Sequence, residues 1–324
     1  MNLQHREYTD SHYQHTLSDS LTFVGRGLHS DIQVVMRMLP AEPNSGIVFA
    51  RRDVAPYRSE IPALWHNVID TRLSTTLGNA LGVRVSTVEH LLAALYACGV
   101  DNARIVLDGP EVPIMDGSAL PFVSVIRQTG TVKQSALRRA FLIKTPISIY
   151  DEDRYACLMP SPVPWICLEI DFDSDAIGKQ EISLPINEKT FHDELAGART
   201  FGFEEQIHTL QSLGLAKGGS LRNAVLVRDD EVLNEGGLRF RDEFVRHKAL
   251  DCIGDMALAG ARVVGQFTGY RTGHQINNDL IRQLMLCDDC WEFTTLAEAQ
   301  AYWNAFRGIT SADSEIEIMK VVDN

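Results

Sequence analysis

A helical pattern of apolar residues runs through Phe244-Val245-Arg246-His247-Lys248-Ala249-Leu250-Asp251-Cys252-Ile253-Gly254-Asp255-Met256. In a helix, His247, Asp251 and Asp255 are spaced four residues apart and project from one face. An imidazole followed one turn later by a carboxylate is a ready pair of metal ligands. The alternative is a partly buried His/Asp pair that only satisfies polar groups, and such pairs are common on ordinary helices. This stretch alone leaves both interpretations open.

The length and composition are those of a globular protein. A chain of 324 residues is typical of about two domains, and 45% hydrophobic with 23% charged residues allows real cores. The formal net charge of −13 argues against a general nucleic-acid binder, because phosphate backbones require basic surfaces. A small local cluster of Arg and Lys can still hold an anionic ligand.

The sequence carries no signal for a membrane span or for export. No apolar run reaches the ~18 residues that cross a bilayer, and residues 1–20 contain no apolar segment typical of a signal peptide. We therefore expect a cytoplasmic protein. The six cysteines do not form a disulfide framework. Cys287 and Cys290 are a lone Cys-x-x-Cys pair, and a zinc knuckle or redox pair is the minority interpretation because both need further partners.

The first half of the chain reads as short strands followed by helices. Ser86 and Glu89 fit a capping box at the start of the clearest helix. Glu89 would then have a structural role, and His90 could be an ordinary core histidine. The Gly- and Pro-rich loop 108–119 directly follows a strand, a placement typical of functional loops. Strands are predicted at residues 31–38, 46–50, 75–79, 83–85 and 102–107, and helices at 86–99 and 121–130.

The second half repeats this order. Strands are predicted at residues 140–150, 155–159, 165–172, 180–184, 223–227 and 261–268, and helices at 188–196, 204–213, 244–260 and 277–286. Strands followed by helices indicate an α+β fold, and the shared pattern predicts a duplicated domain. A basic, polar stretch at 131–139 marks the boundary. The predicted organisation is an extension (1–13), an N-terminal α+β domain (14–135), a C-terminal α+β domain carrying most catalytic residues (136–300) and a tail (301–324).

Several short stretches, in this order and spacing, are together specific although each is weak alone. They are Gly25 to His29, Ser86-Thr87-Val88-Glu89-His90-Leu91, Pro113-Ile114-Met115-Asp116-Gly117-Ser118, Ala198-Arg199-Thr200-Phe201-Gly202-Phe203, Phe244 to Asp251, and Gly273-His274. From about Gln14 to about Trp291, the chain with these stretches resembles the zinc-dependent UDP-3-O-acyl-N-acetylglucosamine deacetylases (the LpxC family). The resemblance implies two similar α+β domains, each an antiparallel sheet packed against helices, with the active site at the domain interface.

The resemblance implies a metal site formed by His90, His247 and Asp251. Three protein ligands leave a fourth position open for water, as catalytic zinc requires. Two neutral imidazoles and one carboxylate keep the site net positive, so the pKa of a bound water is expected to fall towards ~7. His and Asp ligands suit iron(II) as well as zinc, so both ions are expected to fit.

The resemblance also assigns catalytic roles. Glu89 is expected to be the general base, and it projects about 100° away from its neighbour His90 on the helix. His274 is the expected acid that stabilises the oxyanion and protonates the leaving amine. Asp255 would keep His274 charged, because a neighbouring carboxylate raises a histidine pKa. Thr200 is expected to polarise the amide carbonyl.

The implied reaction is hydrolysis of the acetamide of UDP-3-O-(3-hydroxyacyl)-N-acetylglucosamine, which gives the free amine and acetate in lipid A synthesis of a Gram-negative bacterium. Lys248 is expected to point off the metal face and to meet the substrate. Together with Arg271 and Arg154 it is a candidate for holding the diphosphate. The implied acyl passage lies in the second domain near Phe203 to Leu226, and the candidates to line it are Ile207, Leu210, Leu213, Leu215, Ala216 and Leu226. The polar Glu204 at its approach is unexpected. Phe201 is a further candidate for binding the substrate. The expected partner is this small acylated UDP-sugar, with no nucleic acid, at most a transient contact with the inner membrane, and a monomeric chain.

Two rival functions remain open on sequence grounds. A zinc amidase acting on another acylated substrate would keep the metal triad but need other phosphate contacts. A non-catalytic nucleotide-sugar binding protein would carry a structural metal. Structural sites are usually closed by a fourth protein ligand, and no further Cys or His lies suitably near these three in the sequence.

Overall fold

The computed structural model describes residues 12–310, and its first lobe is built on a five-stranded sheet. The strand order is β2-β3-β9-β4-β5, antiparallel throughout except for the parallel pair β4–β9. The predicted extension (1–13) lies almost wholly outside the described residues, as does the tail beyond residue 310. The strands are β2 (Leu21–Arg26), β3 (Gln33–Pro40), β4 (Ile47–Arg51), β5 (Glu60–Pro62) and β9 (Ala103–Leu107).

The second lobe is built on a sheet of the same topology. Its order is β12-β13-β20-β14-β15, again antiparallel except for one parallel pair, β14–β20. In both sheets the last strand along the chain is inserted between the second and the third. The predicted duplicated α+β build is therefore confirmed at the level of strand order. The strands are β12 (Ile147–Asp151), β13 (Arg154–Met159), β14 (Trp165–Asp171), β15 (Lys179–Pro185) and β20 (Gln266–Tyr270).

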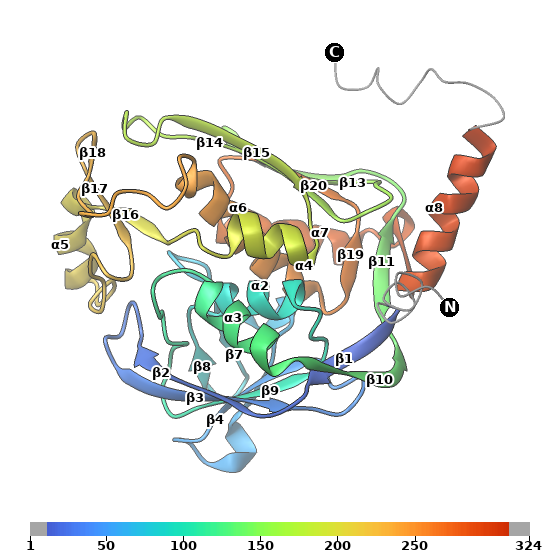
Figure 1. The fold of residues 1–324 in the computed structure, drawn as a ribbon, viewed down its shortest axis with the longest axis horizontal. Coiled ribbons are helices and arrows are strands. Elements are labelled where there is room, and N and C mark those ends of the chain that lie inside the picture. Colours follow the sequence, from blue (N-terminus) through green and yellow to red (C-terminus); the bar gives the residue numbers. More distant parts are fainter. Residues whose placement is uncertain (1–11, 311–324) are drawn as a thin grey trace.

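The long helices of both lobes lie between the two sheets (Figure 1). They are α2 (Glu89–Ala97) and α3 (Leu120–Thr129) from the first lobe, and α6 (Glu243–Met256) and α7 (His274–Leu286) from the second. Helices α2 and α6 touch along their backbones, since a Cβ placed on Gly254 would lie 2.0 Å from the Glu89 carbonyl oxygen. Buried apolar side chains of both lobes form one continuous cluster. The lobes therefore share a core.

Smaller elements complete the architecture. In each lobe a three-stranded sheet is inserted between the fourth strand of the large sheet and the first long helix. In the first lobe it consists of β6 (Val68–Asp70), β7 (Thr76–Gly78) and β8 (Arg84–Val85). In the second it consists of β16 (Phe201–Phe203), β17 (Val225–Arg228) and β18 (Glu231–Val232), and α5 (Glu204–Ser212) follows β16. The remaining pairings are β1 (Tyr13–Leu17) with β10 (Thr131–Leu137), and β11 (Arg139–Ile143) between β19 (Arg262–Val264) and β21 (Trp291–Thr295). The last helix is α8 (Leu296–Thr310), and short helical turns include α4 (Glu188–Thr190) and a π-turn at Phe191–Leu195.

Some local predictions are wrong. The helix expected from Ser86 begins at Glu89, and its N-cap is Val88 without a side-chain hydrogen bond, so the capping box is not formed. The basic stretch 131–139, expected to mark the domain boundary, is largely the strand β10, and the boundary itself stays a prediction. The strand expected at 140–150 is divided into β11 and β12.

Cys287 and Cys290 form a disulfide. Within the described residues, no helix is long and apolar enough to span a membrane.

Candidate active site

Three buried side chains from two helices converge between the lobes. His90 stands in the first turn of α2, and His247 and Asp251 stand one turn apart on α6. The Nε2 atoms of His90 and His247 each lie 3.4 Å from Asp251 Oδ1. One ligand atom from each residue can be chosen so that all three lie within 4.8 Å of one another. The structure thus brings together the three predicted ligands from distant parts of the sequence.

The polar atoms of this cluster fit a divalent cation. Asp251 Oδ1 is buried and has no hydrogen-bond donor among the described residues, although a buried polar atom usually has a partner. The Nδ1–H of His247 donates to the Ala198 carbonyl oxygen at 3.1 Å, which leaves Nε2 as the acceptor facing the cluster. Burial lowers the pKa of His247 to about 4, against the pull of Asp251. Neutral imidazole is the form that binds metal.

Glu89 is a buried carboxylate beside this cluster, directly before His90 in α2. Its Oε2 accepts a hydrogen bond from the Thr75 backbone N–H at 3.0 Å, and its Oε1 lies 4.0 Å from His274 Nε2. Burial raises the pKa of Glu89 to about 7, against the lowering effect of His274 and His90. A carboxyl group with a pKa near neutrality is suited to take up and release a proton.

His274 opens α7 and is held by Asp255 from α6. Its Nδ1–H donates to Asp255 Oδ2 at 2.9 Å. Asp255 also accepts from the Thr75 hydroxyl at 2.6 Å and from the Asn277 amide at 2.9 Å. Burial acts to lower the pKa of His274, but the charge and hydrogen bond of Asp255, with Glu89 and Asp251, raise it to about 9. His274 is therefore held in its charged form at neutral pH.

A cavity of about 360 Å³ opens over these groups. Thr200 and Phe201 line it from the second lobe. The loop 108–119 positions Thr200, because the carbonyl of Gly117 accepts its backbone N–H at 2.8 Å. Gly117 has a φ of +87°, and a Cβ there would lie 2.0 Å from the Asn223 carbonyl oxygen, so the position requires glycine. The predicted residues in the lining are Glu89, His90, Arg154, Thr200, Phe201, His247, Lys248, Asp251 and His274.

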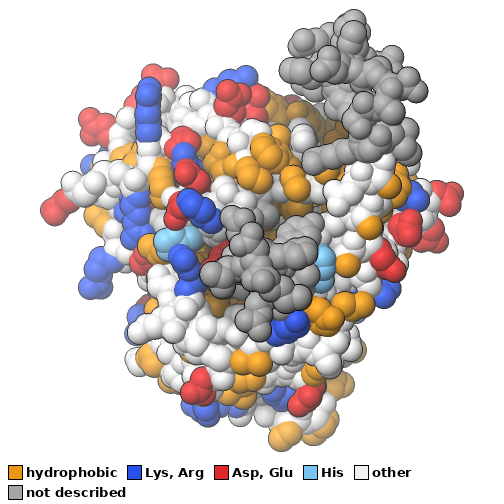
Figure 2. Space-filling model, turned by 45° about the vertical axis from the view of Figure 1, so that its right-hand side comes forward, with side chains coloured by type: hydrophobic (Ala, Val, Ile, Leu, Met, Phe, Trp, Pro, Cys, Tyr) orange, Lys and Arg blue, Asp and Glu red, His pale blue; other side chains and the backbone are white. Residues whose placement is uncertain are grey.

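The candidate diphosphate contacts meet in an adjoining cavity of about 340 Å³, lined by Arg154, Lys248 and Arg271. Each arginine already has an acidic partner: Arg154 pairs with Asp151, and Arg271 pairs with Asp153 and with Asp171. Acidic and basic side chains are also interspersed over the face seen in Figure 2. An anion that binds these cations therefore competes with the carboxylates that already pair with both arginines.

The expectation that Lys248 points off the metal face is wrong. Its Nζ lies 3.5 Å from Asp251 Oδ2 and 5.6 Å from the centre of the Phe201 ring. The flexible stem of a lysine lets the ammonium turn back towards the ligand carboxylate. Lys248 borders both cavities, so it lies where the cluster and the cation-lined cavity meet.

Only part of the expected acyl passage lies along a cavity. A third cavity, of about 670 Å³, is lined by Ile207 and shares the walls Phe172, Phe203 and Gln206 with the cavity over the cluster. Leu226 lines none of these three cavities, and Leu213 is 70% exposed. Glu204, in the wall, is paired with Arg228.

Sequence reasoning missed the residues that hold the site in place. The carboxylate of Glu243 is fully buried and accepts hydrogen bonds from the backbone and side chain of Arg199 and from the backbone N–H of Arg239. This pair fixes the segment that contains Ala198, which orients His247, and Thr200. Thr75 and Asn277 were missed as well. A charged residue at the first position of a helix is an ordinary feature, so no sequence signal marks Glu243.

This site has the arrangement of a metal-dependent hydrolase. Two imidazoles and a carboxylate converge beneath an open cavity, and a buried acid and a charged histidine lie beside them.

A sequence model of the UDP-3-O-acyl N-acetylglycosamine deacetylase family matches residues 14–286. Proteins named UDP-3-O-acyl-N-acetylglucosamine deacetylase are similar over most of the chain. That of Phenylobacterium zucineum is 48% identical over 88% of this chain and 98% of its own length. That of Syntrophotalea carbinolica is 46% identical over 90% and 93%, and that of Haemophilus influenzae 44% over 89% and 94%.

The chain belongs to the UDP-3-O-acyl-N-acetylglucosamine deacetylase family. It is accordingly an enzyme of the deacetylase class, a hydrolase that acts on an amide.

Proposed function

We propose that this enzyme hydrolyses the acetamide of UDP-3-O-(3-hydroxyacyl)-N-acetylglucosamine, with zinc as the cofactor, and releases acetate and UDP-3-O-(3-hydroxyacyl)-glucosamine for lipid A biosynthesis. The names of its relatives support this substrate. The single observation that carries the metal dependence is the convergence of His90 Nε2 and His247 Nε2 on Asp251 Oδ1, a buried oxygen that meets the geometric criteria for no hydrogen bond with the described residues. Iron(II) suits the same ligands.

A divalent ion held by these three residues would lower the pKa of a water molecule and polarise the acetamide carbonyl. Glu89 takes the proton from the attacking water as general base. The His274 imidazolium stabilises the negative charge that develops on the carbonyl oxygen, and the Thr200 hydroxyl supports it. His274 then gives its Nε2 proton to the leaving amine, while Asp255 keeps its ring oriented through Nδ1.

The same cavities provide a place for the rest of the substrate. Lys248, Arg154 and Arg271 hold the diphosphate from one side. Phe201 and the cavity lined by Ile207 take the acyl chain, and Leu226, which pairs with Gly202 across β16 and β17, is a further candidate contact. The two lobes correspond to domains at 14–135 and 136–300, and the enzyme works in the cytoplasm as a monomer.

The function is tested by assaying the full chain on acylated UDP-N-acetylglucosamine of several chain lengths, before and after treatment with a chelator. About one metal ion per chain is expected, and its removal abolishes acetate release until zinc is restored. Glu89→Gln keeps the metal and lowers turnover by about 10²–10⁴-fold, whereas the exposed Glu60→Gln leaves turnover unchanged. Acetate release that persists without metal would contradict the mechanism. Activity only on other acylated amides would contradict the substrate.

A further inference from the structure

A cavity of about 310 Å³ lies between the lobes at the end of α2 that is remote from the cluster. His90 stands in the first turn of α2, whereas Leu92, Leu95 and Tyr96, towards its other end, line this cavity. The opposite wall comes from the second lobe, at the connection from α6 to β19 that includes Ala257. None of the proposed catalytic, metal-binding or substrate-binding residues lines it.

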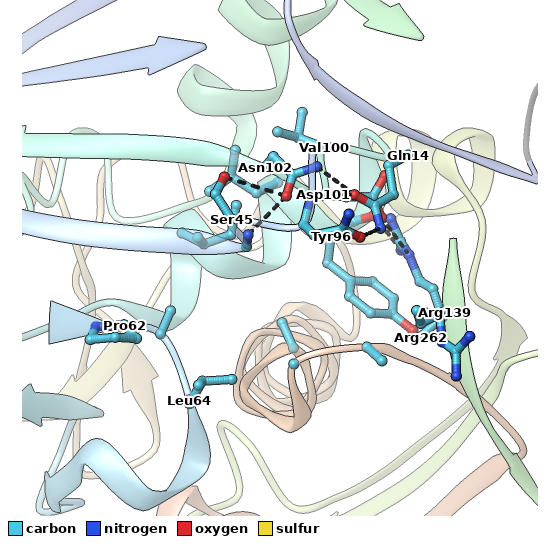
Figure 3. Close-up of a pocket in the computed structure, with 18 of the residues that line it drawn as sticks. Gln14, Ser45, Pro62, Leu64, Tyr96, Val100, Asp101, Asn102, Arg139 and Arg262 are labelled. Carbon is cyan, nitrogen blue, oxygen red and sulfur yellow. Dashed lines mark hydrogen bonds and ion pairs between the residues drawn. The ribbon is translucent and has the colours of Figure 1, made fainter. Parts of the chain in front are cut away.

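The lining has two chemically different ends (Figure 3). Pro62 and Leu64 lie at one end (Figure 3), and Leu92 and Leu95 also contribute aliphatic side chains to the lining. The other end carries amide groups that are already fixed: the Asn102 side chain donates to Gln14 Oε1 at 2.9 Å and accepts from the Gly46 backbone N–H at 2.8 Å. Because these groups are held by the protein itself, the shape of the cavity is formed before any ligand enters.

Positive charge is in excess at the polar end. Asp101 is the only acidic residue among the described residues that line the cavity, and its carboxylate is held by Arg138, outside the lining, at 2.7 Å. Arg262 lies at 3.9 Å from the same carboxylate and stacks at 3.9 Å over the ring of Tyr96. Arg139 is exposed and makes no ion pair with any described residue; its guanidinium lies over the Phe293 ring, and its charge helps to lower the pKa of Glu298. Arginines therefore outnumber carboxylates in this lining, although the net charge of the whole chain is −13.

We propose that this inter-lobe pocket is a second ligand site, which binds a small carboxylate with an aliphatic body. The carboxylate lies against Arg139 and Arg262, whose planar guanidinium groups match its geometry. The aliphatic body lies on Leu64, Leu92 and Leu95. The pocket volume of about 310 Å³ lies near the lower end of the range for small-molecule pockets, about 300–1,000 Å³, and matches a small ligand.

Ligand binding there would connect the two lobes. Leu92 and Leu95 belong to the helix that carries His90, and Ala257 directly follows the helix that carries Asp251. A ligand that contacts both stabilises the lobe packing on which the metal cluster depends. Binding to the folded protein alone raises the temperature of unfolding.

Calorimetric titration of the full chain with octanoate tests the proposal, with octanol and octylammonium as neutral and cationic probes of the same length. Octanoate is expected to bind and to raise the unfolding temperature. Octanol and octylammonium bind at least tenfold more weakly. Arg139→Gln and Arg262→Gln each weaken octanoate binding by about ten- to hundredfold, the effect of a lost charge-assisted hydrogen bond. Arg104→Gln, which changes an exposed arginine on β9, leaves the affinity unchanged.

Octanoate could instead bind in the catalytic cavity, and the variants distinguish the two sites. Lys248→Ala changes that cavity only, so the proposal requires octanoate binding to survive this substitution. Binding that is lost in Lys248→Ala and kept in both arginine variants would overturn the proposal. Equal binding of octanoate and octanol, or no binding of octanoate, would overturn it as well.

Discussion

Gly254 is the residue through which α6 holds α2 at its present distance. A Cβ built on Gly254 would lie 2.0 Å from the Glu89 carbonyl oxygen and 3.0 Å from its Cα. Both contacts are with backbone, so no side-chain rotation relieves them. The substitution Gly254→Ala must therefore move one helix away from the other. The part of α2 that moves carries Glu89 and His90, whereas Asp251 lies on α6. The distance between His90 and Asp251 therefore changes.

The expected effects can be worked out from these distances. Ordinary non-bonded contacts begin at about 3.5 Å, so α2 has to move by roughly 1.5 Å. Metal sites tolerate ligand displacements of about 0.2 Å, and a misplacement of about 1 Å costs roughly 100-fold in rate. Overpacking destabilises by about 1–3 kcal/mol, whereas alanine in place of a helical glycine gains about 0.8–1.0 kcal/mol. The protein is expected to stay folded and to lose most metal affinity and turnover.

Three measurements check this prediction: zinc affinity by competition with a chelator, turnover at saturating zinc, and the free energy of unfolding in urea. Gly236→Ala is the matched control, because no atom lies within 4 Å of the Cβ position and the backbone there is not left-handed. A Gly254→Ala enzyme with the zinc affinity and turnover of the parent would refute the close contact between α2 and α6 as the cause of the ligand geometry.

Other predictions concern single groups of the site. With the pKa of Glu89 about 7 and that of His274 about 9, kcat/KM is expected to fall below the first value and above the second. Asp255→Asn removes the charge that raises the pKa of His274, so the alkaline limb moves to lower pH; an unmoved limb would show that another group titrates there. Glu243→Gln breaks a buried ion pair and is expected to lower the free energy of unfolding by about 3–5 kcal/mol in urea titrations; an unchanged value would deny it a structural role. Lys248→Ala is expected to raise the KM for the UDP-sugar more than it lowers kcat, and steady-state kinetics showing an unchanged KM would remove it from the binding site.

Local sequence patterns were sufficient to predict the strands and helices that occur in the same order in both halves of the chain. The α+β class and the similar build of the two halves follow from the strand and helix order, and both are present in the two sheets of equal topology. The predicted hairpin near residues 75–85 is β7 paired with β8. The prediction of a capping box at Ser86 was wrong because the same short motif fits both the start of a helix and an extended segment. Here the Ser86 hydroxyl accepts a hydrogen bond from the Thr76 hydroxyl across the hairpin, and the helix begins only at Glu89.

Spacing within one helix was enough to align His247 with Asp251, since a turn of α-helix repeats every 3.6 residues. Placing His90 beside them needed the tertiary structure, because the separation of two helices depends on the side chains between them, and here Gly254 provides none. The same holds for Glu243, Thr75 and the cations around the inter-lobe pocket. Their partners come from distant segments, and only the packing of the two lobes brings those segments together.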